Sequence, residues 1–206
     1  MGLKPRRTDH RSALVRTKTA SPPTRSATLA RIEPAFMGVI MDTATRNPSI
    51  TSDSRSAVEA LDRFAAQPDV LAALLRARAH AEARLRDSPE LEAASVTLDP
   101  ILLGWSAPEV LGSIRVSVTR TAGGDAFECH ANSTQYLLVL DGPVETHVET
   151  PSGWRIDRYG LGGSVELHDR WHVIAPGVWH KTVAPDASYW GIVAFHSARE
   201  TSDEYR

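Results

Sequence analysis

Two side chains of the kind that bind metal ions, Glu128 and His130, stand one residue apart at the end of the stretch GGDAFECH, residues 123–130. A second imidazole, His180, follows the turn sequence Pro176-Gly177 much later in the chain. Residues i and i+2 of a β-strand point to the same face. Glu128 and His130 can therefore converge on one point, which His180 can reach from a neighbouring strand. The spacing predicts a metal site between antiparallel strands.

These side chains would supply two imidazoles and one carboxylate, a set that suits Fe(II) and oxygen chemistry when coordination positions stay open. Gln135 can add a neutral oxygen or orient a water beside the ion. We predict one divalent metal ion held by Glu128, His130, Gln135 and His180, with Fe(II) preferred and Ni, Mn or Zn as alternatives. The other interpretation is that Glu128 is solvated while the two histidines form hydrogen bonds in a polar pocket.

The spacing resembles the two sequence motifs of the cupin superfamily. The first motif reads E-x-H-x4-Q-x6-G from Glu128 to Gly142, and the second reads PGVWH at residues 176–180. Glu128 stands where the family usually has a histidine, and Gln135 where it usually has a glutamate. The resemblance covers about residues 110–198. It implies an antiparallel cupin-type β-barrel (a double-stranded β-helix or jelly roll) and a homodimer.

The resemblance also implies metal-dependent chemistry on a small organic molecule. Our leading hypothesis is an Fe(II) dioxygenase with its catalytic residues unassigned. A cupin lyase or isomerase, or a non-catalytic module that binds a small ligand, are the alternatives, because a fold alone does not choose among reactions. The sequence has no Ser-His-Asp order, Walker sequence, GxGxxG after a strand or CxxC pair, so it gives no support to those classes.

The elements that must position the site follow from residue 95 onward, where apolar residues recur with a period of two. Turn sequences at residues 151–153 and 160–163 separate the segments. Many short strands without intervening helices predict an all-β sandwich or barrel. The expected strands include residues 96–98, 114–118, 135–140, 144–149, 154–158, 165–167 and 190–195.

A helical segment precedes the strands at residues 56–87. Ser56 and Glu59 match the capping-box pattern that begins a helix. Pro68 interrupts the apolar spacing, and Ser88-Pro89 ends it. We expect these helices to pack on the outside of the barrel or to form a dimer contact.

Residues 1–36 differ in composition from the rest of the chain. They carry eight of the 23 basic residues and two of the 25 acidic residues, and they lack helical or strand periodicity. We predict a disordered basic tail at 1–50, a helical segment at 51–94 and the cupin domain at 95–206. The tail has the composition of a transit peptide or a nucleic-acid-binding arm, and an upstream start codon is the remaining alternative.

The whole chain has a net charge of −2 and 42% hydrophobic residues, which indicates no attraction to nucleic acid or anionic membranes. Its one cysteine, Cys129, excludes an internal disulfide and fits a cytoplasmic location. We expect a small-molecule substrate as the partner, and no membrane or nucleic acid.

Other histidines and tryptophans fall outside the predicted ligand set. His147 is expected on a polar strand face. His168 and His172 are expected on a loop surface, with a position in the lining of the pocket as the alternative, and the facing of His196 stays open. Core packing is expected for the tryptophans of the barrel region, with one or two of them forming a wall of an apolar substrate pocket as the alternative; they are Trp154, Trp171, Trp179 and Trp190.

Overall fold

The computed structural model describes residues 49–120, 126–140, 142–160, 166–184 and 189–206. All the described residues belong to the second of the chain's two units, Met41–Arg206. The predicted basic tail at 1–50 therefore lies almost wholly outside the described residues. The boundaries predicted at residues 51 and 95 fall inside the second unit.

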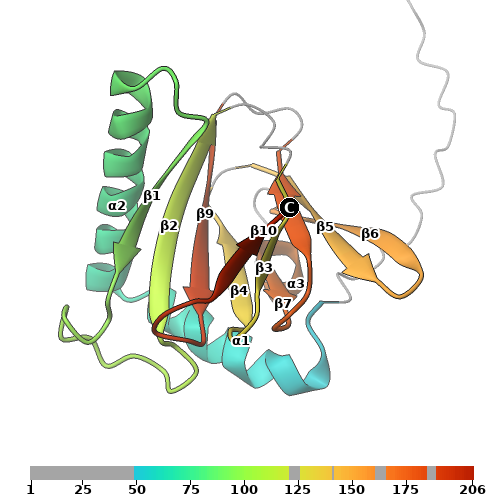
Figure 1. The fold of residues 1–206 in the computed structure, drawn as a ribbon. Coiled ribbons are helices and arrows are strands. Elements are labelled where there is room, and N and C mark those ends of the chain that lie inside the picture. The colour runs from blue at the N-terminus through green and yellow to red at the C-terminus, as the bar shows by residue number, and fades with distance from the viewer. Residues whose placement is uncertain (1–48, 121–125, 141, 161–165, 185–188) are drawn as a thin grey trace, which may run out of the picture. The chain divides into compact units, whose positions relative to one another are not determined.

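Two antiparallel five-stranded sheets form the body of this unit (Figure 1). The first sheet has the order β1-β2-β9-β4-β7 and the second β10-β3-β8-β5-β6. The strands are β1 (Ala93–Leu98), β2 (Ser113–Arg120), β3 (Glu128–His130), β4 (Gln135–Val139), β5 (Val144–Thr150), β6 (Gly153–Tyr159), β7 (Trp171–Ile174), β8 (His180–Val183), β9 (Tyr189–His196) and β10 (Asp203–Tyr205). This jelly-roll-like arrangement, preceded by helices, confirms the predicted fold class.

The helical segment consists of two helices, α1 (Ser52–Ala65) and α2 (Pro68–Asp87). The capping box predicted at Ser56 is wrong, because the N-cap of α1 is Thr51. The Thr51 hydroxyl accepts a hydrogen bond from the Ser54 N–H, and the Ser54 hydroxyl accepts one from the Thr51 N–H. This reciprocal pair needs no glutamate, so the helix begins one turn earlier than predicted. Pro68 starts α2, as its missing N–H allows.

Both helices pack on the first sheet. Leu61 and Phe64 of α1 are buried in one core cluster with Trp171 and Phe195. The last turns of α2 pack against β1 and β2 through Ala81 and Leu85, which contact Ala94 and Val118. A polar contact adds to this packing, because Trp171 Nε1 and Arg170 Nη2 donate to Asp62 Oδ1 at 2.8 and 2.7 Å. The helices are therefore part of the domain core.

The strand predictions fail where segments are very short. The strand predicted at 165–167 is wrong for its described residues, because Glu166 caps and Leu167 begins the one-turn helix α3 (Leu167–Arg170), while residue 165 lies outside the described residues. The strands β7 and β10 went unpredicted. Three of the four residues of β7 are buried, so no alternation marks it. β10 has only three residues and a half-buried or exposed pattern.

The tryptophans divide between core and surface. Trp171 and Trp190 are buried, as predicted. Trp154 is 47% exposed on β6, so the core packing predicted for it is wrong. It stacks on Phe127 with ring centroids 4.4 Å apart, on the face of the second sheet that points away from the first. Cys129 is buried, as predicted, and burial is the main cause that raises the pKa of its thiol.

No helix in the described part of the chain is both long enough and apolar enough to span a membrane.

The substitution Leu61→Ala should lower the free energy of unfolding by about 2–5 kcal/mol, because it opens a cavity between α1 and the first sheet. Chemical denaturation measures this change. The same substitution at Leu75, which is 51% exposed on α2, should change it by about 0.5 kcal/mol or less. Equal effects at both positions would contradict the packing of α1 as part of the core.

Candidate metal centre

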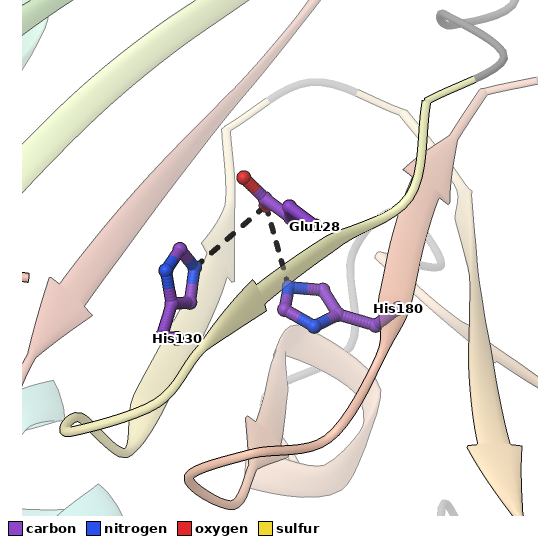
Figure 2. Close-up of side chains that lie close together, drawn as sticks. All are labelled: Glu128, His130 and His180. Atoms are coloured by element: carbon purple, nitrogen blue, oxygen red, sulfur yellow. Dashed lines mark ion pairs between the residues drawn. The ribbon is translucent and has the colours of Figure 1, made fainter. Parts of the chain in front are cut away.

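The strands β3 and β8 bring the three predicted side chains together (Figure 2). Glu128 and His180 are direct cross-strand partners, and His130 lies two residues along on the same face of β3. Glu128 Oε1 is 3.3 Å from His180 Nε2 and 3.9 Å from His130 Nε2. All three candidate ligand atoms lie within 4.8 Å of one another. The side chains therefore surround a single point between the two sheets.

The turn before β8 is tied directly to β3. Gly177 has a positive φ of 74°, a conformation that glycine adopts without strain. Its N–H donates a hydrogen bond to the carbonyl of His130 at 3.0 Å. The Pro176-Gly177 turn thus fixes the distance between the two histidine-bearing strands, as the sequence predicted.

The Nδ1 atom of each imidazole forms a hydrogen bond with a defined partner. His130 Nδ1 donates to Asp203 Oδ1 at 2.7 Å, and His180 Nδ1 donates to the carbonyl of Val178 at 2.9 Å. In a neutral imidazole this leaves the Nε2 lone pair free. Both Nε2 atoms are buried and have no hydrogen-bond partner among the described residues.

This pattern fits a metal ion. Histidine ligands usually donate their second ring nitrogen to a carboxylate or a backbone carbonyl, which fixes the tautomer and the ring orientation. His130 shows the first kind of partner and His180 the second. The residues present could therefore hold a divalent cation through two nitrogens and the Glu128 carboxylate. Which ion they hold, and whether they hold one, stays a prediction.

The electrostatics keep Glu128 ionised. Burial acts to raise the pKa of its carboxyl, but the interactions with the adjacent His180, with His130 and with Arg115 outweigh burial. The pKa of Glu128 consequently lies below its ordinary value. A negative carboxylate beside two imidazoles is the charge arrangement that a divalent cation requires.

Asp203 is a further candidate site residue, which the sequence did not predict. It belongs to β10, where it is the register partner of His130. Arg115 Nη2 donates to its second oxygen at 2.9 Å, so one carboxylate orients both side chains. Burial acts to raise the pKa of Asp203, but hydrogen bonds from Thr201, Arg115 and His130 lower it well below its usual range. No motif marks this residue, because its role depends on a pairing between distant segments.

Gln135 comes from the first sheet, at the start of β4. It is buried, and its Oε1 has no hydrogen-bond partner among the described residues. It lines the same cavity as Glu128. The structure thus places Gln135 close to the site, and a ligand role for it stays a prediction.

The cavity beside Glu128 lies between the two sheets and has a volume of about 240 Å³. Hydroxyl groups dominate its polar lining, and Arg115 brings a guanidinium group to it. The side chains of Trp190 and Ile192 give it an apolar wall. The lining hydroxyls come from Ser95, Ser117, Thr119, Thr182 and Tyr205.

The structure corrects the prediction for His172 and shows which way His196 faces. His172 is buried in β7, so the loop surface predicted for it is wrong; its Nε2 donates to Asp157 at 2.9 Å. His196 faces inward, with its ring centroid 4.8 Å from that of His130. Burial, followed by the charges of His130 and Arg115, lowers the pKa of His196 to about 3.

His147 and His168 form no part of the candidate ligand set. His147 is half-buried on β5, 3.7 Å from Glu145, in keeping with a polar strand face. His168 lies in the one-turn helix α3, 3.3 Å from Asp169.

No protein-family model and no curated protein matches the sequence. Solved structures of cupin-fold proteins match it at low identity. Peruvianin-I, a cysteine peptidase from Thevetia peruviana latex, is 12% identical with a TM-score of 0.44 over 56% of this chain and 67% of its own. An oxalate oxidase in complex with the substrate analogue glycolate is 13% identical with a TM-score of 0.45 over 57% of this chain and 56% of its own.

An oxalate decarboxylase from Bacillus subtilis is 10% identical with a TM-score of 0.42. The match covers 55% of this chain and only 27% of the decarboxylase chain. At such identities and scores the likeness concerns the fold, and it assigns no substrate or reaction to this chain.

The substitution Asp203→Asn should weaken Zn(II) binding by about 10–100-fold, because it removes the charge that orients His130. Competition with a chromophoric chelator measures the dissociation constant. Glu204→Gln is the matched control, since Glu204 is the next residue of β10 and is exposed. Unchanged affinity in Asp203→Asn would show that this carboxylate does not position a ligand.

Proposed function

We propose that this chain is a metal-dependent cupin enzyme that acts on a small organic molecule, and that its reaction is an Fe(II)-dependent dioxygenation. One observation carries the proposal: beside the Glu128 carboxylate, the Nε2 atoms of His130 and His180 are buried and have no hydrogen-bond partner in the described part of the chain. Two imidazoles and one carboxylate with open positions are the ligands with which proteins hold Fe(II) for oxygen chemistry.

The residues of the site would have two roles, binding the ion and orienting its ligands. Glu128, His130 and His180 would hold the ion, while Asp203 and the Val178 carbonyl keep both imidazoles in the ligating tautomer. Gln135 is available as a further oxygen ligand or as a partner for a bound water. The bound ion would supply neighbouring coordination positions that hold O₂ and substrate side by side.

The cavity supports a polar substrate that carries a negative charge. Arg115 is the guanidinium that lines it, and it is oriented by Asp203 and by Thr201 at 3.3 Å. A guanidinium fork binds carboxylates in two-point geometry. The ring of hydroxyls would accept or donate hydrogen bonds to polar groups of the same molecule. A small hydroxy or oxo acid, anchored at Arg115 and reaching Glu128, fits this lining.

Metal reconstitution tests the proposal. The protein, stripped of metal and reloaded in turn with Fe(II), Mn(II), Ni(II) or Zn(II), should bind about one ion per chain. The Fe(II) form should consume O₂ in an oxygen electrode with one or more members of a panel of small hydroxy and oxo acids. His180→Ala should bind no ion and consume no O₂, because it removes one of the two imidazoles of the triad. His80→Ala, an exposed histidine on α2, should behave as the unmodified protein.

The outcomes separate the alternatives. Failure of both the purified and the reloaded protein to hold metal would overturn the enzyme proposal in favour of a module that binds a small ligand. A metal-loaded protein that converts a substrate without consuming O₂ would indicate a lyase or isomerase instead.

A homodimer and a cytoplasmic location are further proposals. The exposed Trp154 and Ile156 on β6 support a contact between copies, since large apolar side chains favour burial. The single cysteine supports a reducing compartment.

A further inference from the structure

His196 is a buried histidine outside the proposed ligand set of Glu128, His130 and His180. It is the last residue of β9, in the first sheet, where it pairs with Gln135 of β4 and Ser113 of β2. Its exposed fraction is 1%. Both of its ring nitrogens are buried and lack a hydrogen-bond partner among the described residues.

Such a side chain is unusual. Most buried polar atoms in native proteins have a hydrogen-bond partner, and an exception points to a bound water, an ion or a catalytic use. The contrast with His172 is informative, because that equally buried histidine donates its Nε2 to Asp157. His196 has two unsatisfied nitrogens where His172 has one.

His196 lies beside the candidate metal centre. Its ring centroid is 4.8 Å from that of His130, with the rings nearly perpendicular at 87°. Its register partner Gln135 carries an Oε1 that also lacks a hydrogen-bond partner among the described residues. Unsatisfied polar atoms gathered this close to a candidate ligand point to a bound ion in the space they share.

We propose that His196 is a third imidazole ligand of the metal centre, so that the bound ion joins the two sheets. This inference rests on the proposed metal-dependent function. Glu128, His130 and His180 come from the second sheet, and His196 would close the site from the first. His196 stands outside the set of three whose ligand atoms lie within 4.8 Å of one another, so its side chain must turn towards the ion on binding.

The ligand set would then be three imidazoles and one carboxylate. An ion shared between the sheets stabilises the folded state, because the unfolded chain has no such site. His196 would also stand next to Gln135, so two side chains of the first sheet whose buried polar atoms lack a partner among the described residues would face the same ion.

X-ray absorption at the metal edge of the Zn(II)-loaded protein tests this inference, because ring scattering reports the number of bound imidazoles. Three imidazoles are expected in the unmodified protein and two in His196→Ala. The Zn(II) affinity of His196→Ala should fall by at least about 10–100-fold, the range known for loss of an outer-shell partner. Free imidazole added to His196→Ala should restore much of the affinity by filling the vacated space, whereas a purely structural histidine would not give this rescue.

The failure of each proposal is distinguishable. Two imidazoles in the unmodified protein, or unchanged Zn(II) affinity in His196→Ala, would overturn the role of His196. In either case, loss of Zn(II) binding in His130→Ala would still support the metal centre. An unmodified protein that binds no Zn(II) or Fe(II) would overturn both. If His196→Ala does not fold, as circular dichroism would show, the imidazole count of the unmodified protein decides.

Discussion

The pairing of β3 between β8 and β10 is the constraint on which the site depends. On one side Glu128 lies opposite His180, and this single register pair determines how close the carboxylate comes to the second imidazole. On the other side all three residues of β3 pair with β10, which places Asp203 beside His130. A slip of one residue in either pairing would turn these side chains to the other face of the sheet.

Strand β3 has only three residues, so contacts beyond its own ladder must hold it in place. The C-terminal residue Arg206, which follows β10, makes such contacts. The backbone of Arg206 exchanges two hydrogen bonds with that of Phe127, which extends the β10–β3 ladder. The Arg206 guanidinium lies 4.4 Å from the centre of the Trp179 ring and 2.8 Å from a Glu149 oxygen. Cation–π contacts of this kind hold the end of β10 in place, and with it Asp203.

Asp203 also connects the candidate metal site to the candidate substrate cavity. One oxygen accepts from His130 and the other from Arg115, so the orientation of the ligand and that of the guanidinium are set by the same carboxylate. A change at Arg115 therefore reaches His130 through one shared group, and the two functions of the site are not independent. Helix α1 packs on the outer face of the first sheet. Gln135 of β4 and His196 of β9 lie on the inner face of the same sheet and point towards the site.

The sequence by itself determined the local features of this protein: most of the residues that form the antiparallel strands, that Glu128 and His130 share a face, and that a Pro-Gly turn delivers His180 to them. These follow from the period of a strand and from turn stereochemistry, which act over a few residues. Only the tertiary structure decided the surroundings of Asp203, His172 and His196. Their neighbours lie 73, 15 and 66 residues away, at His130, Asp157 and His130, and no local pattern encodes a contact over such separations. The N-cap predicted at Ser56 was wrong because Thr51 and Ser54, which also carry hydroxyl groups, form the reciprocal pair that begins the helix.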